Sequence, residues 1–246
     1  MQDISILSEI GGREYNQDCV MVSQKNGKFC IAVADGLGSY NGSEIASLTA
    51  VQFLVDWFNK NCDSEKLFVK SEISSALLRA HNKIVDIKEK DLSIASSCTT
   101  IAFVVSDGIT SVMAHIGDTR IYEIKNGKIF YRSKDHSLAQ IAVERGEITP
   151  DQISKHRDQN KLLRVLGSDY FTDADISTDF FPLSYGDGFV VCTDGLWEYV
   201  SEKEIEDLFE NKDTSCVKLN KLKKLHDDRA DNYCDNFSVA VFVKGE

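Results

Sequence analysis

The stretch CVMVSQKNGKFCIAVADG, residues 19–36, has the pattern of two strands joined by a tight turn. Asn26-Gly27 separates two apolar runs, and this dipeptide is the strongest short-range sign of a two-residue β-hairpin. Such a turn places Asp35 opposite Asp18. The hairpin therefore predicts an antiparallel sheet with two carboxylates at one edge. Like charges directly opposite each other destabilise a sheet, so the placement of these two carboxylates needs an explanation other than the stability of the sheet.

Apolar patterns in the rest of the chain predict further antiparallel strands and several helices. The segment 99–133 shows four strand patterns, with Asp107-Gly108 and Asn126-Gly127 as hairpin turns. Because strands and helices come in blocks with little βαβ alternation, the pattern favours the α+β class, with antiparallel sheets covered by helices. The other expected elements are strands at 3–10, 189–194 and 237–243, and helices at 45–58, 73–87, near 137, from 149, 201–209 and 217–229.

Length and composition indicate an ordinary globular protein. The 246 residues are 42% hydrophobic and 27% charged, and no repeat or linker divides them, so we expect a single domain over residues 1–246. The net charge of −11 argues against nucleic-acid binding. Without an apolar run near the ~18 residues of a membrane span or a signal-peptide pattern, the chain is expected in the cytoplasm. The seven scattered cysteines form no C-x-x-C pair and are expected to be reduced, so the sequence argues against a thiolate zinc site.

Five aspartates flank predicted strands. Asp35, Asp118 and Asp194 end strands, whereas Asp18 and Asp235 come directly before them. Each alone is most often a turn residue, but in an antiparallel sheet the end of one strand lies beside the start of its neighbour, so all five can gather at one edge. Clustered carboxylates repel each other or take up protons unless a cation separates them. Oxygen ligands with no His or Cys among them indicate Mg²⁺ or Mn²⁺ rather than Zn²⁺.

Arg13 lies five residues before Asp18. An isolated arginine is usually a solvated surface residue. Beside a cluster of carboxylates and metal ions, however, its planar guanidinium can bind a phosphate through two parallel hydrogen bonds. The combination predicts a site for a phosphoryl group.

Eight segments together resemble the metal-dependent serine/threonine protein phosphatases of the type 2C class, in the compact form found in bacteria. They appear in the family's order and span nearly the whole chain. They are GGREYNQD (11–18), VADGLGSYNGSEIAS (33–47), CTTIAFVV (98–105), AHIGDTRIY (114–122), KDHSLAQ (134–140), LLRVLGS (162–168), VVCTDGLWEYVSEKEI (190–205) and DNFSVAV (235–241).

The resemblance implies a four-layer αββα sandwich, two antiparallel sheets face to face with helices outside. It also implies that two Mn²⁺ or Mg²⁺ ions bind at the aspartates. Asp35, Asp194 and Asp235 would hold the first ion, and Asp35 with the backbone carbonyl of Gly36 would hold the second. A segment at about 137–160 would form a flap near the substrate.

The remaining two aspartates also receive roles from the resemblance. Asp18 would anchor the second metal site, and Asp118 would hold a third, weaker ion together with Asp194. On this interpretation the hairpin sets Asp18 against Asp35 because a metal ion lies at that edge.

The implied reaction is hydrolysis of phosphoserine or phosphothreonine by direct attack of a metal-bridging hydroxide. Arg13 would bind the substrate phosphate, and Arg13, Asp35 and Asp194 are the expected catalytic residues. The expected partners are phosphorylated proteins, the substrates of a serine/threonine kinase, with neither nucleic acid nor membrane involved. We expect a monomer.

Four positions depart from the family pattern without removing an expected metal ligand. Gln17 replaces a common glutamate, Ser39 and Cys98 replace glycines, and Leu37 stands where relatives carry Met or His. With Leu37 there, the donor of the proton to the leaving oxygen stays open.

Three proton donors remain possible: a metal-bound water, His136 and His156, although each histidine fits a structural role better. The sequence also leaves alternative functions. One is a catalytically weak phosphatase-like module that binds phosphoproteins, and another is a metal-dependent nuclease, which the acidic composition disfavours.

Overall fold

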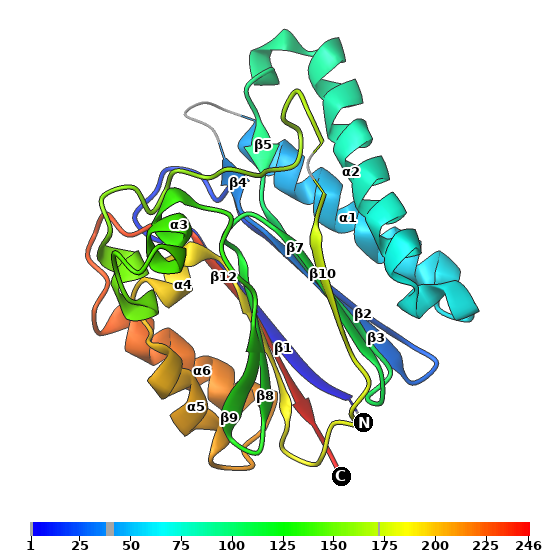
Figure 1. Ribbon diagram of the computed structural model, residues 1–246, viewed down its shortest axis with the longest axis vertical. Helices are drawn as coiled ribbons and strands as arrows, with labels where there is room; N and C mark the ends of the chain where they lie inside the picture. Colours follow the sequence, from blue (N-terminus) through cyan, green and yellow to red (C-terminus); the bar gives the residue numbers. More distant parts are fainter. Residues whose placement is uncertain (1, 38–41, 172) are drawn as a thin grey trace.

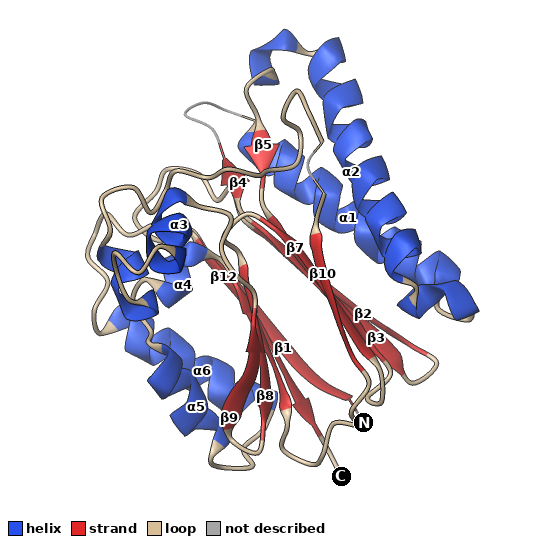
Figure 2. Cartoon of the chain, viewed as in Figure 1, coloured by secondary structure: helices blue, strands red, loops and turns tan. Residues whose placement is uncertain are grey.

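Two five-stranded antiparallel sheets lie face to face, with helices on both outer faces (Figures 1 and 2). The computed structural model describes residues 2–37, 42–171 and 173–246; the departure predicted at Ser39 lies outside them. The first sheet has the strand order β1 (Gln2–Glu9), β12 (Phe237–Lys244), β11 (Gly188–Cys192), β8 (Arg120–Lys125) and β9 (Lys128–Arg132). The second has the order β10 (Asp175–Asp179), β7 (Ser111–Ile116), β6 (Ile101–Ser106), β3 (Lys28–Ala34) and β2 (Cys19–Lys25).

Helices complete the four layers and confirm the predicted αββα sandwich. The second sheet is covered by α1 (Ser43–Asn61) and α2 (Lys70–Lys90), with short 3₁₀ helices η1 (Glu65–Phe68) and η2 (Leu92–Ile94) at the ends of α2. The first sheet is covered by α4 (Asp194–Trp197), α5 (Glu202–Phe209) and α6 (Ser215–Asp227). Within the described ranges, no helix is long and apolar enough to cross a bilayer.

The end of the sandwich away from the chain termini holds the short elements (Figure 1). There, β4 (Gly36–Leu37) pairs with β5 (Cys98–Thr99). The 137–160 segment folds into α3 (Leu138–Glu144) and the 3₁₀ helix η3 (Pro150–Lys155), which the buried Ile153 attaches to the core. The helix predicted from residue 149 is therefore a 3₁₀ helix.

The hairpin turns follow the sequence closely at two of three places. Asn26 and Gly27 have φ of 51° and 75°, and Lys25 pairs with Lys28, as a two-residue turn requires. The Asn126-Gly127 turn has the same form. At Asp107-Gly108 the loop is wider, with Ser106 and Ser111 as the last pair, because the Asp107 carboxylate accepts hydrogen bonds from the backbone N–H of residues 109 and 110 at 2.8 and 2.7 Å.

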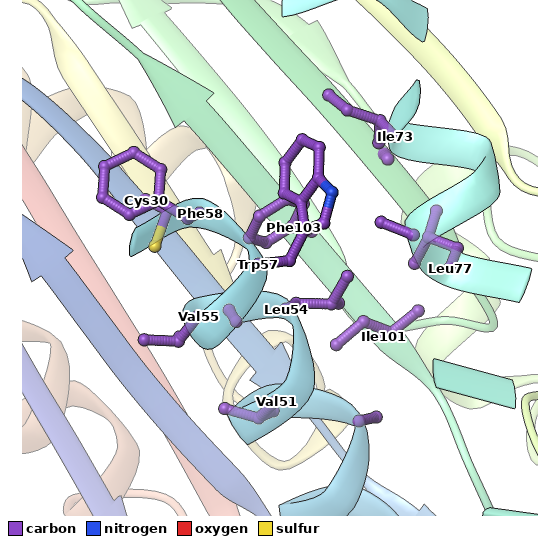
Figure 3. Packing of buried hydrophobic residues seen from close by; sticks show 14 of the residues in the cluster. Cys30, Val51, Leu54, Val55, Trp57, Phe58, Ile73, Leu77, Ile101 and Phe103 are labelled. Atoms are coloured by element: carbon purple, nitrogen blue, oxygen red, sulfur yellow. The ribbon is translucent and has the colours of Figure 1, made fainter. Parts of the chain in front are cut away.

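Apolar side chains hold the layers together. Between the sheets, the rings of Phe29 and Phe242 stack with centroids 4.2 Å apart. On the outer face of the second sheet, α1 inserts Leu54 and Phe58 toward Phe103 (Figure 3). These side chains are fully buried, and truncating one of the phenylalanines to alanine typically costs about 3–5 kcal/mol. The packing fixes the strand ends on which the site depends.

Candidate metal centre

A pocket of about 170 Å³ opens at the end of the sandwich where β4 and α4 lie. Four of the five predicted aspartates line it, and the fifth, Asp18, lies half-buried beside them. The lining residues are Arg13, Gln17, Asp35, Gly36, Leu37, Asp118, Asn160, Leu162, Asp194 and Asp235.

Three hydrogen bonds fix the backbone of Asp35 and Gly36. The Asp35 N–H donates to the Thr100 hydroxyl at 2.9 Å, and its carbonyl accepts from the Thr100 N–H at 2.9 Å. The Gly36 N–H donates to the Gln17 carbonyl at 3.1 Å. A Cβ at Gly36 would lie 2.5 Å from the Ser43 carbonyl oxygen and 2.6 Å from that of Gln17. Only glycine fits here, so the chain can pass closely enough to leave the Asp35 side chain facing the pocket.

Asp18 lies behind this pair, where its charge has few partners. One carboxylate oxygen accepts from the Thr193 hydroxyl at 2.8 Å, and the other is buried without a hydrogen-bond partner. Thr193 directly precedes Asp194, the first residue of α4. Asp18 and Asp194 are therefore connected through one threonine.

Asp118 is almost fully buried, and one of its carboxylate oxygens also has no hydrogen-bond partner. Its backbone carbonyl accepts a hydrogen bond from the indole Nε1–H of Trp197 at 3.0 Å. Asp235 lies nearer the surface, where the Arg13 Nη2 donates to its Oδ2 at 2.5 Å. The Arg13 side chain is 55% exposed, so the arginine stands at the rim of the pocket.

Burial and mutual repulsion raise the pKa values of four carboxylates, those of Asp18, Asp35, Asp118 and Asp194. Burial, with repulsion from Asp194 and Asp235, raises the pKa of Asp18 to about 8. Burial and repulsion from Asp235 raise the pKa of Asp194 to about 7. Burial and the Asp194 charge hold the pKa values of Asp35 and Asp118 well above their usual range. Unpartnered buried oxygens of this kind fit divalent cations, which supply the missing positive charge.

A different cluster forms the tightest group of ligand-type side chains in the described part of the chain. Atoms of His115, His136 and Asp175 lie within 4.8 Å of one another. His136 Nδ1, however, accepts from the Gly117 N–H at 3.1 Å, so a neutral His136 carries its proton on Nε2 and has no lone pair there for a metal. Arg164 also binds Asp175 at 2.9 Å. This cluster is a structural support, and the predicted aspartates are not part of it.

The geometry also bears on the proton donor. Burial, together with His115 and Arg164, lowers the pKa of His136 to about 4, and the ring is neutral at pH 7. His156 is not among the pocket-lining residues and accepts from the Asp158 N–H at 3.2 Å. Neither histidine is placed to donate a proton in the pocket.

Four pocket residues were not predicted as site residues: Gln17 and Leu37, which the sequence singled out only as departures from the family pattern, and Asn160 and Leu162. Asn160 and Leu162 follow η3 and reach the pocket because Gln159 donates to Glu198 at 2.6 Å and the Leu163 N–H donates to the His136 carbonyl at 2.8 Å. Both contacts are tertiary. The segment LLRVLGS was recognisable in the sequence, but nothing in it indicated a place in the pocket.

A sandwich of two antiparallel sheets, with clustered carboxylates at one end and an arginine at the rim, defines a metal-dependent phosphoester hydrolase. The family model described as protein phosphatase 2C matches residues 8–227. The chain therefore belongs to the protein phosphatase 2C family, and the resemblance found in the sequence is confirmed.

Individual relatives agree with this family. The serine/threonine phosphatase stp of Listeria monocytogenes serovar 1/2a is 29% identical over 207 residues, which cover 82% of this chain and 80% of the relative. The protein phosphatase PhpP of Streptococcus pneumoniae is 29% identical over 209 residues, covering 84% and 83%.

Solved structures show the same fold. The serine/threonine phosphatase PstP/Ppp of Mycobacterium tuberculosis superimposes with a TM-score of 0.86 at 22% identity, covering 100% of this chain and 99% of that one. A second structure, the PstP catalytic domain in complex with two manganese ions, gives a TM-score of 0.84 at 22% identity over the same shares. The serine/threonine phosphatase of S. agalactiae gives 0.83 at 27% identity, covering both chains completely.

Proposed function

We propose that this protein is a metal-dependent serine/threonine phosphatase that hydrolyses phosphoserine and phosphothreonine in proteins. The observation that carries the proposal is the carboxylate pocket with Arg13 at its rim, in a chain of the protein phosphatase 2C family. Relatives named serine/threonine phosphatase support the choice of substrate class.

Two Mn²⁺ or Mg²⁺ ions are the proposed cofactors. Asp35, Asp194 and Asp235 would hold the first, and Asp35 with the Gly36 carbonyl would hold the second. When bound, such ions lower the pKa of water and neutralise phosphoryl oxygens. The manganese ions named for a structural neighbour support the choice of metal.

Asp18 and Asp118 complete the proposed ligand set. Asp18 would support the second site from behind, since one of its oxygens already accepts from Thr193 and the other is unpartnered. Asp118 would bind a third ion together with Asp194, because its unpartnered oxygen belongs to a side chain that lines the same pocket.

Arg13 is the proposed substrate-binding residue. Its Nη2 is bonded to Asp235, which fixes the direction of the guanidinium at the rim. The remaining N–H groups of the fork can then bind two oxygens of the incoming phosphate. Arg13 would orient the phosphoryl group over Asp35 and Asp194, the other proposed catalytic residues.

The proposed cellular role is signal transduction in the cytoplasm, opposing a serine/threonine kinase, by a monomer with one catalytic domain over residues 1–246. The seven free cysteines support a reducing compartment. Residues 137–160 would act as a flap, since they hold α3 and η3 at the pocket end of the sandwich.

The deciding experiment measures hydrolysis of p-nitrophenyl phosphate and of a phosphothreonine peptide with Mn²⁺, with Mg²⁺ and with EDTA. A phosphatase releases phosphate from both substrates only with metal. If binding of the same peptide, measured in parallel, is tight but no phosphate is released, the phosphatase-like binding module is supported. Cleavage of a nucleic-acid strand added under the same metal conditions would support the nuclease.

A further inference from the structure

We propose that Trp197 is a positioning residue that fixes the backbone of Asp118 so that its carboxylate can bind a cation, an inference that rests on the proposed function. Trp197 is the last residue of α4, the helix that begins with Asp194. Its indole Nε1–H donates to the Asp118 carbonyl at 3.0 Å, and its side chain is buried. One short helix therefore carries one proposed ligand and holds the backbone of another.

A buried ion pair holds the indole in place. The Arg120 guanidinium lies 3.8 Å from the centre of the Trp197 ring, a close cation–π contact. Arg120 in turn binds Asp135 through two parallel hydrogen bonds of 2.8 and 2.6 Å. Burying such a pair carries a desolvation penalty, but the two hydrogen bonds fix the orientation of the guanidinium over the indole ring. The contact with Arg120 restricts rotation of the Trp197 side chain away from the Asp118 carbonyl.

Gly117, the residue before Asp118, is hydrogen-bonded to His136. The Gly117 N–H donates to His136 Nδ1 at 3.1 Å, and the Gly117 carbonyl accepts from the His136 N–H at 2.9 Å. Gly117 has φ of 99°, and a Cβ there would lie 2.5 Å from the Thr100 Cγ2, so only glycine fits. With the backbone hydrogen-bonded on both sides of the 117–118 peptide, the Cα–Cβ bond of Asp118 keeps one direction toward the pocket.

The Arg120–Trp197 pair also borders a second cavity, of about 370 Å³. Arg120 and Trp197 line it together with Pro150 and Ser154 of η3. The indole thus lines a cavity together with the proposed flap and is hydrogen-bonded to Asp118, the proposed cation ligand. A buried tryptophan needs an acceptor for its indole N–H in any case; here the acceptor is the carbonyl of a residue that lines the pocket.

The first test follows the indole N–H directly by NMR. The chain has two tryptophans, so Trp57→Phe leaves a single indole signal, that of Trp197. Titration with Mg²⁺ should shift this signal, and the part of the shift due to the Asp118 site should disappear in Trp57→Phe/Asp118→Asn. An indole signal unmoved at saturating Mg²⁺, or an identical shift with and without the Asp118 carboxylate, would overturn the proposal.

The second test measures Mn²⁺ binding by calorimetry. Trp197→Phe keeps an aromatic ring against Arg120 but removes the N–H donor. In this variant the affinity of the weakest Mn²⁺ site, the one proposed at Asp118, should fall roughly two- to tenfold, the effect of one neutral hydrogen bond. The two more tightly bound Mn²⁺ ions should bind as in wild type. Trp57→Phe is the matched control, because Trp57 packs on Phe103 at the other sheet and should leave all affinities unchanged.

The outcomes separate this proposal from the proposed function. Unchanged Mn²⁺ affinities in a folded Trp197→Phe would refute the positioning role. If that variant does not fold, the NMR titration in the Trp57→Phe background decides alone. Neither measurement depends on turnover. If the wild-type protein hydrolysed no phosphopeptide, the proposed function would be refuted, but the NMR and calorimetric tests of Trp197 would still be valid.

Discussion

Replacing Arg13 by alanine should reduce catalysis far more than stability. The variant loses a charge-assisted contact to the substrate phosphate, worth on the order of 1.5–3 kcal/mol. That loss corresponds to roughly a ten- to 150-fold lower kcat/KM. Part of it should appear in KM, because the phosphate already carries its charge in the bound substrate.

The effect on folding should be small, because the Arg13 and Asp235 side chains are 55% and 37% exposed. An ion pair this exposed contributes at most about 1 kcal/mol. The assay compares kcat/KM on one phosphopeptide for wild type, Arg13→Ala and Arg13→Lys, with melting temperatures measured alongside. Lysine should restore only part of the activity, since an ammonium cannot form the planar fork. Unchanged kinetics in Arg13→Ala, or a loss that only follows unfolding, would refute the reasoning.

Three further outcomes are expected. Activity should vanish in excess EDTA and return with Mn²⁺ or Mg²⁺; full activity in the chelator would contradict the metal mechanism. Asp235→Asn should abolish turnover, whereas Asp118→Asn should lower it with two ions still bound, as counted by calorimetry. Glu204 is tested by pH. Its hydrogen bonds to Arg229 lower its pKa from 4.5 to about 2, and a group whose pKa is lowered by folding stabilises the native state above its unfolded pKa. Glu204→Gln should therefore melt below wild type at pH 6, and the gap should close as the pH falls from 4.5 toward 2; a gap independent of pH would show that the ion pair is not responsible.

Local patterns in the sequence were enough to predict the strands and the edge at which the carboxylates gather. The Asn26-Gly27 turn fixed the register of β2 and β3, and with it the approach of Asp18 and Asp35. Turn residues act on their immediate neighbours, so their effect is visible in a single sequence. For the same reason the start of α5 at Ser201 was predictable from its capping box.

Contacts between distant segments could not be predicted in this way. No spacing in the sequence indicates that Trp197 donates to Asp118 or that Leu162 reaches the pocket. Both depend on how the 137–160 segment and α4 pack on the first sheet. The wider loop at Asp107 was missed for a smaller reason: its carboxylate satisfies two backbone N–H groups that a tight turn would leave to other partners.

The position of β12 in the first sheet has a consequence for the synthesis of the protein. This strand lies between β1, the first strand described, and β11, and Asp235 directly precedes it. β1 therefore has no partner that joins it to the rest of the first sheet until residues 237–244 have left the ribosome, although β1 emerged long before. Pairing of segments so far apart in sequence carries a high loop-closure cost and is slow. A nascent chain can complete most of the second sheet early, but it can assemble the full set of proposed ligands only after Asp235 and β12 have been synthesised, so a chain terminated before Asp235 has an incomplete site.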